Sequence, residues 1–157
     1  MGYKQAALSL GDFLLCFTLY WALSVIIHEY MHLEVLRYFG GDGYIKIGFV
    51  SAYVQFTTPP TQPFIVALSG GIGLALLYGV LAYRNWANFD PEEYSSLLPI
   101  ITGQLFYGFF EAFFIYTMPL AQFADISQLV FIAGLLVGLV PAIWIMGQQL
   151  MAKLGEG

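Results

Sequence analysis

Both histidines of this chain lie in one pentapeptide, His28-Glu29-Tyr30-Met31-His32, at the end of a long apolar run. Residues four apart share one face of a helix, so two imidazoles with this spacing can bind the same metal ion. The glutamate after the first histidine then leans over an open coordination position, where it can take a proton from a zinc-bound water. The structural alternative is a pair of interfacial histidines and a snorkelling glutamate at a helix end. The spacing favours a zinc site with His28 and His32 as ligands and Glu29 as the general base.

The composition indicates a membrane protein. Of the 157 residues, 59% are hydrophobic and 10% are charged, and the mean hydropathy is +0.75, which is too apolar for a soluble domain. Apolar stretches long enough to cross a hydrocarbon core of ~30 Å as helices cover residues 7–27, 61–83, 94–118 and 126–152. The formal net charge of −5 argues against nucleic acid as a partner.

We therefore expect an all-α, multi-pass integral membrane protein that forms a single transmembrane domain over residues 1–157. Its partners would be the lipid bilayer and a membrane protein or peptide. About four transmembrane helices are predicted, covering about residues 7–38, 61–84, 91–118 and 126–150.

The segment between the first two helices has a different pattern. Gly40 and Gly41 are expected to end the first helix soon after Arg37, because paired glycines free the chain to turn. Residues 44–56 are rich in β-branched and aromatic side chains that partly alternate with polar ones. This pattern predicts a short β-hairpin or re-entrant strand pair packed against the helices. An ordinary loop outside the membrane is the alternative.

The third helix carries a carboxylate that needs an explanation. Its start is marked by Asp90-Pro91-Glu92-Glu93, in which Asp90 can cap the helix and Glu93 can complete a capping box. Glu111 lies much further along, among phenylalanines. An unpaired carboxylate there costs several kcal/mol unless it is protonated, paired or bound to metal. The alternative to a metal ligand is a protonated Glu111 that is hydrogen-bonded to a neighbouring helix.

The topology brings this carboxylate to the histidines. With four crossings, the first and third connections lie on the same side of the membrane. Glu111 precedes Pro119 by about 10 Å of helix, and His28 and His32 lie a similar distance before Arg37. The three side chains are therefore expected at one depth. Three further residues form a polar and small stripe on the same helix as Glu111, namely Gln104, Tyr107 and Gly108.

The histidine motif, the strand-like insert and the glycine-rich second span together resemble the site-2 protease family of intramembrane zinc metalloproteases. The segment Ala67-Leu68-Ser69-Gly70-Gly71 looks like a variant of the glycine-containing segment that opens the family's following helix. The resemblance implies a core of three transmembrane helices and cleavage of a membrane-embedded substrate segment.

The resemblance also implies a third zinc ligand from an aspartate in a Leu-Asp-Gly motif, which this chain lacks. The nearest positional counterpart is Asp125, which has no following glycine. Asp125 can also be explained as the cap of the fourth helix, with Gln128 three residues later as in a capping box. Glu111 has no such structural duty, so Glu111 is the preferred third ligand and Asp125 the alternative.

The expected function is a membrane-embedded zinc metalloendopeptidase, with His28, His32 and Glu111 as ligands and Glu29 as the base. The extended segment at residues 45–56 is a candidate for holding substrate as an added strand. The main alternative is a non-proteolytic, metal-binding membrane scaffold or assembly protein of the same fold. A membrane redox or transport protein is a weaker rival, because haem ligands usually come from different helices.

Overall fold

The computed structural model describes residues 2–48, 52–88 and 90–155. Within these residues the chain forms four long helices and one two-stranded antiparallel sheet. In chain order the elements are α1 (Gly2–Tyr38), β1 (Asp42–Ile47), β2 (Ala52–Thr58), α2 (Pro63–Ala87), α3 (Pro91–Phe114) and α4 (Leu120–Gly155). The predicted helical class with a hairpin after the first helix is confirmed, although residues 49–51 of the expected segment lie outside the described residues.

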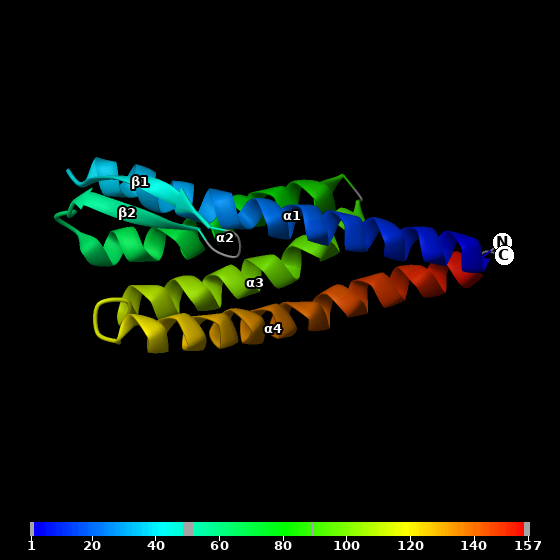
Figure 1. Cartoon of the computed structure of the whole chain (residues 1–157). Helices are drawn as coiled ribbons and strands as arrows, with labels where there is room; N and C mark the ends of the chain where they lie inside the picture. The colour runs from blue at the N-terminus through cyan, green and yellow to red at the C-terminus, as the bar shows by residue number, and fades with distance from the viewer. Residues whose placement is uncertain (1, 49–51, 89, 156–157) are drawn as a thin grey trace.

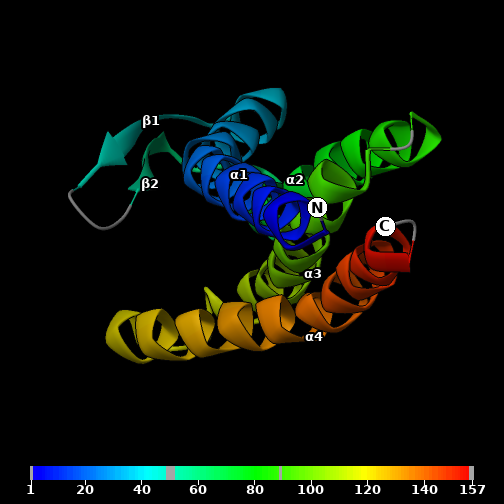
Figure 2. The ribbon, with the colours of Figure 1, turned by 90° about the vertical axis from the view of Figure 1, so that its right-hand side faces the viewer.

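The four helices extend along the length of the molecule (Figure 1), and α4 is inclined to α1 (Figure 2). The start of α1 and the end of α4 lie at one end of the molecule, and the hairpin and the α3–α4 connection lie at the other (Figure 1). Seen along the helices, α3 lies between the α1–α2 pair and α4, and the hairpin extends to one side of α1 (Figure 2). Stretches long and apolar enough to cross a membrane are Ser9–Tyr38, Pro63–Ala87, Pro91–Phe114 and Ala121–Ala152.

The junction of α1 with the hairpin follows the sequence signal. Gly40 adopts a positive φ of 75°, which glycine allows without steric cost, and the N–H of Gly41 donates to the carbonyl of Leu36 at 3.0 Å. Leu36 is fully buried in a cluster with Leu33 and Val66, against which Ile45 of β1 and Val54 of β2 pack. Because Ile45 and Val54 are also cross-strand partners, this contact fixes the hairpin against the end of α1.

Two glycines set the spacing between α2 and α3. A Cβ atom on Gly71 would lie 2.6 Å from the backbone nitrogen of Gly108, and one on Gly108 would lie 2.9 Å from the backbone nitrogen of Ile72. The two helix backbones therefore touch at this point, as small residues permit in membrane helices. This close approach brings the α3 side chains on either side of Gly108 to the face of α2 that also meets α1.

The predicted boundary between the third and fourth helices is wrong. α3 ends at Phe114 instead of about residue 118, since the Thr117 N–H and the Met118 N–H both donate to the Phe114 carbonyl at 3.0 Å and close a tight turn. α4 begins at Leu120 instead of residue 126, because the Pro119 carbonyl already accepts the first helical bond, from the Phe123 N–H at 2.9 Å. Pro119 therefore precedes the start of α4, and the turn at residues 115–118 ends α3 before it.

The start of α3 agrees with the sequence in part. Asp90 caps the helix, because its carboxylate accepts the Glu93 N–H at 3.2 Å. The reciprocal half of the expected capping box is replaced by other contacts. The Asp90 N–H donates to the Asn85 carbonyl at 2.9 Å, and the Glu93 carboxylate accepts the Tyr20 hydroxyl of α1. Glu93 thus ties α3 to α1 at the end of the molecule remote from the hairpin.

Candidate metal centre

The two histidines lie on the face of α1 that packs against α2 and α3. His28 and His32 are buried, with 6% and 5% of their surface exposed. Their rings meet edge to face, with centroids 4.6 Å apart and an interplanar angle of 79°. The two Nε2 atoms are 3.0 Å apart. The helical spacing of four residues therefore does what the sequence predicts, which is to point two imidazole nitrogens at one place.

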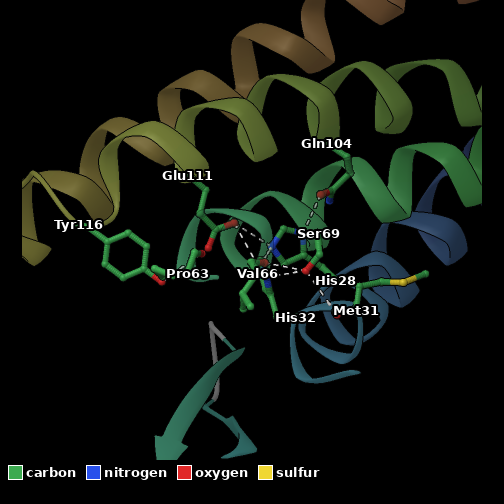
Figure 3. Close-up of polar contacts among 9 residues, drawn as sticks. All are labelled: His28, Met31, His32, Pro63, Val66, Ser69, Gln104, Glu111 and Tyr116. Atoms are coloured by element: carbon green, nitrogen blue, oxygen red, sulfur yellow. Dashed lines mark hydrogen bonds and ion pairs between the residues drawn. The ribbon is translucent and has the colours of Figure 1, made fainter. Parts of the chain in front are cut away.

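Glu111 of α3 reaches the same place. Its Oε2 atom lies 3.4 Å from His28 Nε2 and 3.2 Å from His32 Nε2 (Figure 3). The residue is 8% exposed, and Oε2 has no hydrogen-bond partner among the described residues. The expected meeting of the three side chains at one depth is confirmed. Within the described part of the chain they form a group that could hold a metal ion.

The outer nitrogen of each ring faces an oxygen. His28 Nδ1 lies 2.9 Å from Gln104 Oε1, and His32 Nδ1 lies 2.6 Å from the carbonyl of Val66 (Figure 3). A carbonyl oxygen can only accept, so a neutral His32 ring carries its proton on Nδ1 and presents a bare lone pair at Nε2. The same holds for His28 when the Gln104 oxygen faces it. Two lone pairs and a carboxylate oxygen then converge with no proton between them.

Because residue 70 of α2 is a glycine, the space in front of the two Nε2 atoms stays open. A Cβ atom there would overlap His32 Nε2 and would lie 2.6 Å from His28 Nε2. Only glycine lets the α2 backbone pass this close to the two ligand atoms. Val66, four residues earlier on the same helix, supplies the carbonyl partner of His32. The α2 segment thus lines one side of the site with its backbone and with the Ser69 hydroxyl, which lies 3.4 Å from His32 Nδ1.

Glu29 follows His28 on α1 and stands beside the group. It is partly exposed and lies near Val54 of β2. The hairpin is therefore close to the carboxylate that the sequence singles out as a base. A carboxylate in this position can exchange protons with a molecule bound in front of the histidines.

An aromatic side chain and a neighbouring hydroxyl complete the surroundings. The Tyr107 ring packs edge to face on His28, with centroids 5.1 Å apart. The Tyr116 hydroxyl, in the turn after α3, lies 3.4 Å from the Pro63 carbonyl (Figure 3). Burial and, to a lesser extent, the negative charge of Glu111 raise the pKa of Tyr116. This hydroxyl therefore remains a neutral donor at physiological pH.

Asp125, the alternative third ligand, lies elsewhere. It is an exposed residue on the second turn of α4 and is not part of the group formed by the histidines and Glu111. The expectation that it caps the fourth helix is wrong, because α4 begins five residues earlier, at Leu120.

Some of the site was not foreseen from the sequence. The role of the Val66 carbonyl could not be predicted from the sequence, because every residue has a backbone carbonyl. Gly70 belongs to the glycine segment that the sequence singles out, but its place over the imidazoles requires the helix packing. Gln104 is predicted on the polar stripe of the third helix without its contact to His28. Comparisons of the chain with models of protein families, with curated proteins and with solved structures find no match.

Proposed function

We propose that this protein is an intramembrane zinc metalloendopeptidase. The observation that carries the proposal is the convergence of His28 Nε2, His32 Nε2 and Glu111 Oε2, all acceptors, beside a fourth group, Glu29, that can move protons. Buried acceptors that face one another without protons repel, and a cation between them removes the repulsion. A metal ion is the simplest occupant.

The spacing and the donor set support zinc. Bonds of about 2.0–2.1 Å to a tetrahedral zinc ion put neighbouring ligand atoms about 3.3 Å apart. The three ligand atoms here are separated by 3.0, 3.2 and 3.4 Å. Two imidazoles and one carboxylate are also a ligand set of catalytic zinc sites, which keep a fourth position open.

The chain's own residues fit peptide hydrolysis. When bound, zinc supplies a Lewis acid that polarises a carbonyl and makes water a nucleophile near neutral pH. Glu29 takes the proton of the attacking water and delivers it to the leaving amine. Glu29 follows His28 on α1, and Val54 of the hairpin lies near its carboxylate. A peptide bond in a helix is already hydrogen-bonded, so the substrate must be extended before attack, and the neighbouring hairpin offers strand edges to an extended segment.

The direct test of proteolysis is Glu29→Gln. The amide keeps the shape but cannot accept a proton, so the variant should keep its zinc and lose cleavage of a membrane-embedded reporter peptide by at least about 100-fold. Glu34→Gln is the matched control. Glu34 is on the same helix but is half exposed and pairs with Arg37, so this variant should cleave like the wild type. Wild-type cleavage by Glu29→Gln would place the base elsewhere.

A non-proteolytic, metal-binding scaffold is the second candidate. The missing Leu-Asp-Gly motif favours it, because the third ligand of this site would come from a different residue type than in the site-2 protease family. The two candidates share the metal centre and differ in the use of Glu29. A zinc-loaded wild type that cuts no membrane peptide, together with full function of Glu29→Gln in the cell, would establish the scaffold.

A further inference from the structure

The two imidazoles of the metal centre are held by different kinds of partner. His32 Nδ1 faces a backbone carbonyl, that of Val66, at 2.6 Å. His28 Nδ1 faces a side chain, Gln104 Oε1, at 2.9 Å. We propose that Gln104 is the positioning residue of the site, and that its amide oxygen fixes His28 in the tautomer and the ring orientation that bind metal. This inference rests on the proposed metal centre and is independent of proteolysis.

The direction of the Gln104 hydrogen bond decides whether His28 can bind metal. If Oε1 accepts, His28 carries its proton on Nδ1, and Nε2 points its lone pair toward Glu111 and His32. If the amide were reversed, its NH2 group would donate to Nδ1, and a neutral ring would carry its proton on Nε2, where it would block the metal. Gln104 is therefore a residue whose acceptor function, and not merely its bulk, matters.

The position of Gln104 on α3 supports this role. Gln104 and Glu111 are seven residues apart, which is two helical turns or about 10 Å of rise, so both side chains leave α3 toward α1. Gly108 lies between them and touches the α2 backbone at Gly71. One rigid helix, anchored at that contact, thus supplies both a ligand and the partner of another ligand. Gln104 is 6% exposed, so water does not readily replace it.

The neutral side chain also suits the charge of the site. A divalent cation together with the Glu111 and Glu29 carboxylates gives a net charge of zero. A neutral acceptor at position 104 keeps that balance in an apolar surrounding, whereas a third carboxylate adds a negative charge. The acceptor function can nevertheless be tested with glutamate, because a carboxylate accepts from Nδ1–H and cannot donate when ionised.

The test compares zinc affinity in two variants of the full chain, measured by competition with a chelator in detergent. Gln104→Leu has a similar size and no acceptor, and should bind zinc about 10- to 100-fold more weakly, as for other partners of metal-bound histidines. Gln104→Glu restores the acceptor and should bind within about threefold of the wild type or more tightly. Gln148→Leu makes the same change at an exposed position of α4 and should leave the affinity unchanged.

Two outcomes would overturn the inference. Wild-type affinity in Gln104→Leu would show that the contact does not position His28. Equal losses in Gln104→Leu and Gln104→Glu would show that Gln104 serves packing alone.

A second measurement covers the case in which Gln104→Leu does not fold. In the metal-free wild type at alkaline pH, nitrogen NMR of the two histidines should show His28 protonated on Nδ1, assigned from the ring signal that moves in Gln104→Glu. Protonation on Nε2 would overturn the inference. If the wild type binds no zinc, the proposed function fails, while this spectrum still reports on the Gln104 contact.

Discussion

Two clusters of polar side chains in the described part of the chain differ in the balance of donors and acceptors. The first is the candidate metal centre of His28, His32 and Glu111, near the hairpin. The second lies toward the other end of the helices and links Tyr20, Tyr78 and Glu93. Both connect α1 to α3 through a carboxylate of α3.

In the second cluster each tyrosine hydroxyl donates to an oxygen acceptor. The Tyr20 hydroxyl donates to the Glu93 carboxylate, and the Tyr78 hydroxyl donates to the Tyr20 carbonyl at 2.9 Å. Tyr78 is 1% exposed, so its hydrogen bond matters for stability. A phenol is the right partner for a carboxylate because it brings a proton. This cluster is complete as it stands, and its function is to hold helices together.

In the candidate metal centre the outer nitrogen of each ring faces an acceptor, Gln104 Oε1 or the Val66 carbonyl. The inward-facing atoms are two imidazole nitrogens and the carboxylate oxygen of Glu111. The comparison teaches that burial of polar groups is a weak sign of a functional site, whereas a surplus of acceptors is a strong one. The following variants test this difference, beginning with the largest expected effect.

Glu111→Gln should weaken zinc binding by more than about 100-fold. This loss is larger than the one usually caused by mutating a residue that only hydrogen-bonds a metal ligand. An amide is a poor zinc ligand but a tolerable neutral isostere, so the fold should remain intact. Asp125→Asn is the control and should bind zinc like the wild type, because Asp125 is exposed on α4. Zinc affinity and far-UV circular dichroism of both variants check this. Zinc lost from Asp125→Asn and kept in Glu111→Gln would make Asp125 the ligand.

Gly70→Ala should also impair the metal centre, because the added Cβ would overlap His32 Nε2. We expect zinc affinity to fall by at least about 10-fold, as when a histidine ligand loses its proper orientation. Gly79→Ala is the matched change on the same helix, where a Cβ would meet nothing within 4 Å. It should keep full affinity and gain up to about 1 kcal/mol of helix stability. Equal zinc affinities in the two variants would contradict the packing of α2 against the ligands.

Tyr20→Phe should have the smallest effect on metal and a measurable effect on stability. It removes the donor to Glu93, so the free energy of unfolding should fall by about 1.5–3 kcal/mol, the range for hydrogen bonds to charged groups. Zinc affinity should be unchanged. Tyr83→Phe, at a side chain 76% exposed, controls for loss of a phenol. Urea unfolding in detergent measures the stability of both variants. Loss of zinc from Tyr20→Phe without a loss of stability would contradict this prediction and mean that the two clusters are coupled.

Much of the fold follows from local signals in the sequence. The length of the apolar runs predicts four helices, and Gly40 and Asp90 mark helix ends correctly. The expected end of the third helix at residue 118 and the expected start of the fourth at residue 126 are both wrong. Proline is also compatible with a helix start, and the backbone bonds of the Thr117 turn, which decide the matter, have no counterpart in a residue pattern.

The convergence of His28, His32 and Glu111 in the candidate metal centre was predictable, and the surroundings of this group were not. The spacing of His28 and His32 and the cost of burying Glu111 are properties of residue type, so they can be inferred without a structure. The carbonyl of Val66, the passage of α2 at Gly70 and the contact of Gln104 with His28 depend on how three helices pack. They require the geometry of the Gly71–Gly108 contact, which no periodic pattern specifies.

The most direct test of the account is the zinc content of the purified wild-type protein beside that of the His28→Ala/His32→Ala double variant. An acceptor cluster that requires a cation should retain about one zinc per chain through purification without chelators, and the double variant should retain less than about a tenth of that. Elemental analysis gives both numbers directly. A metal-free wild type that takes up no added zinc, or a double variant with full zinc content, would contradict the central claim.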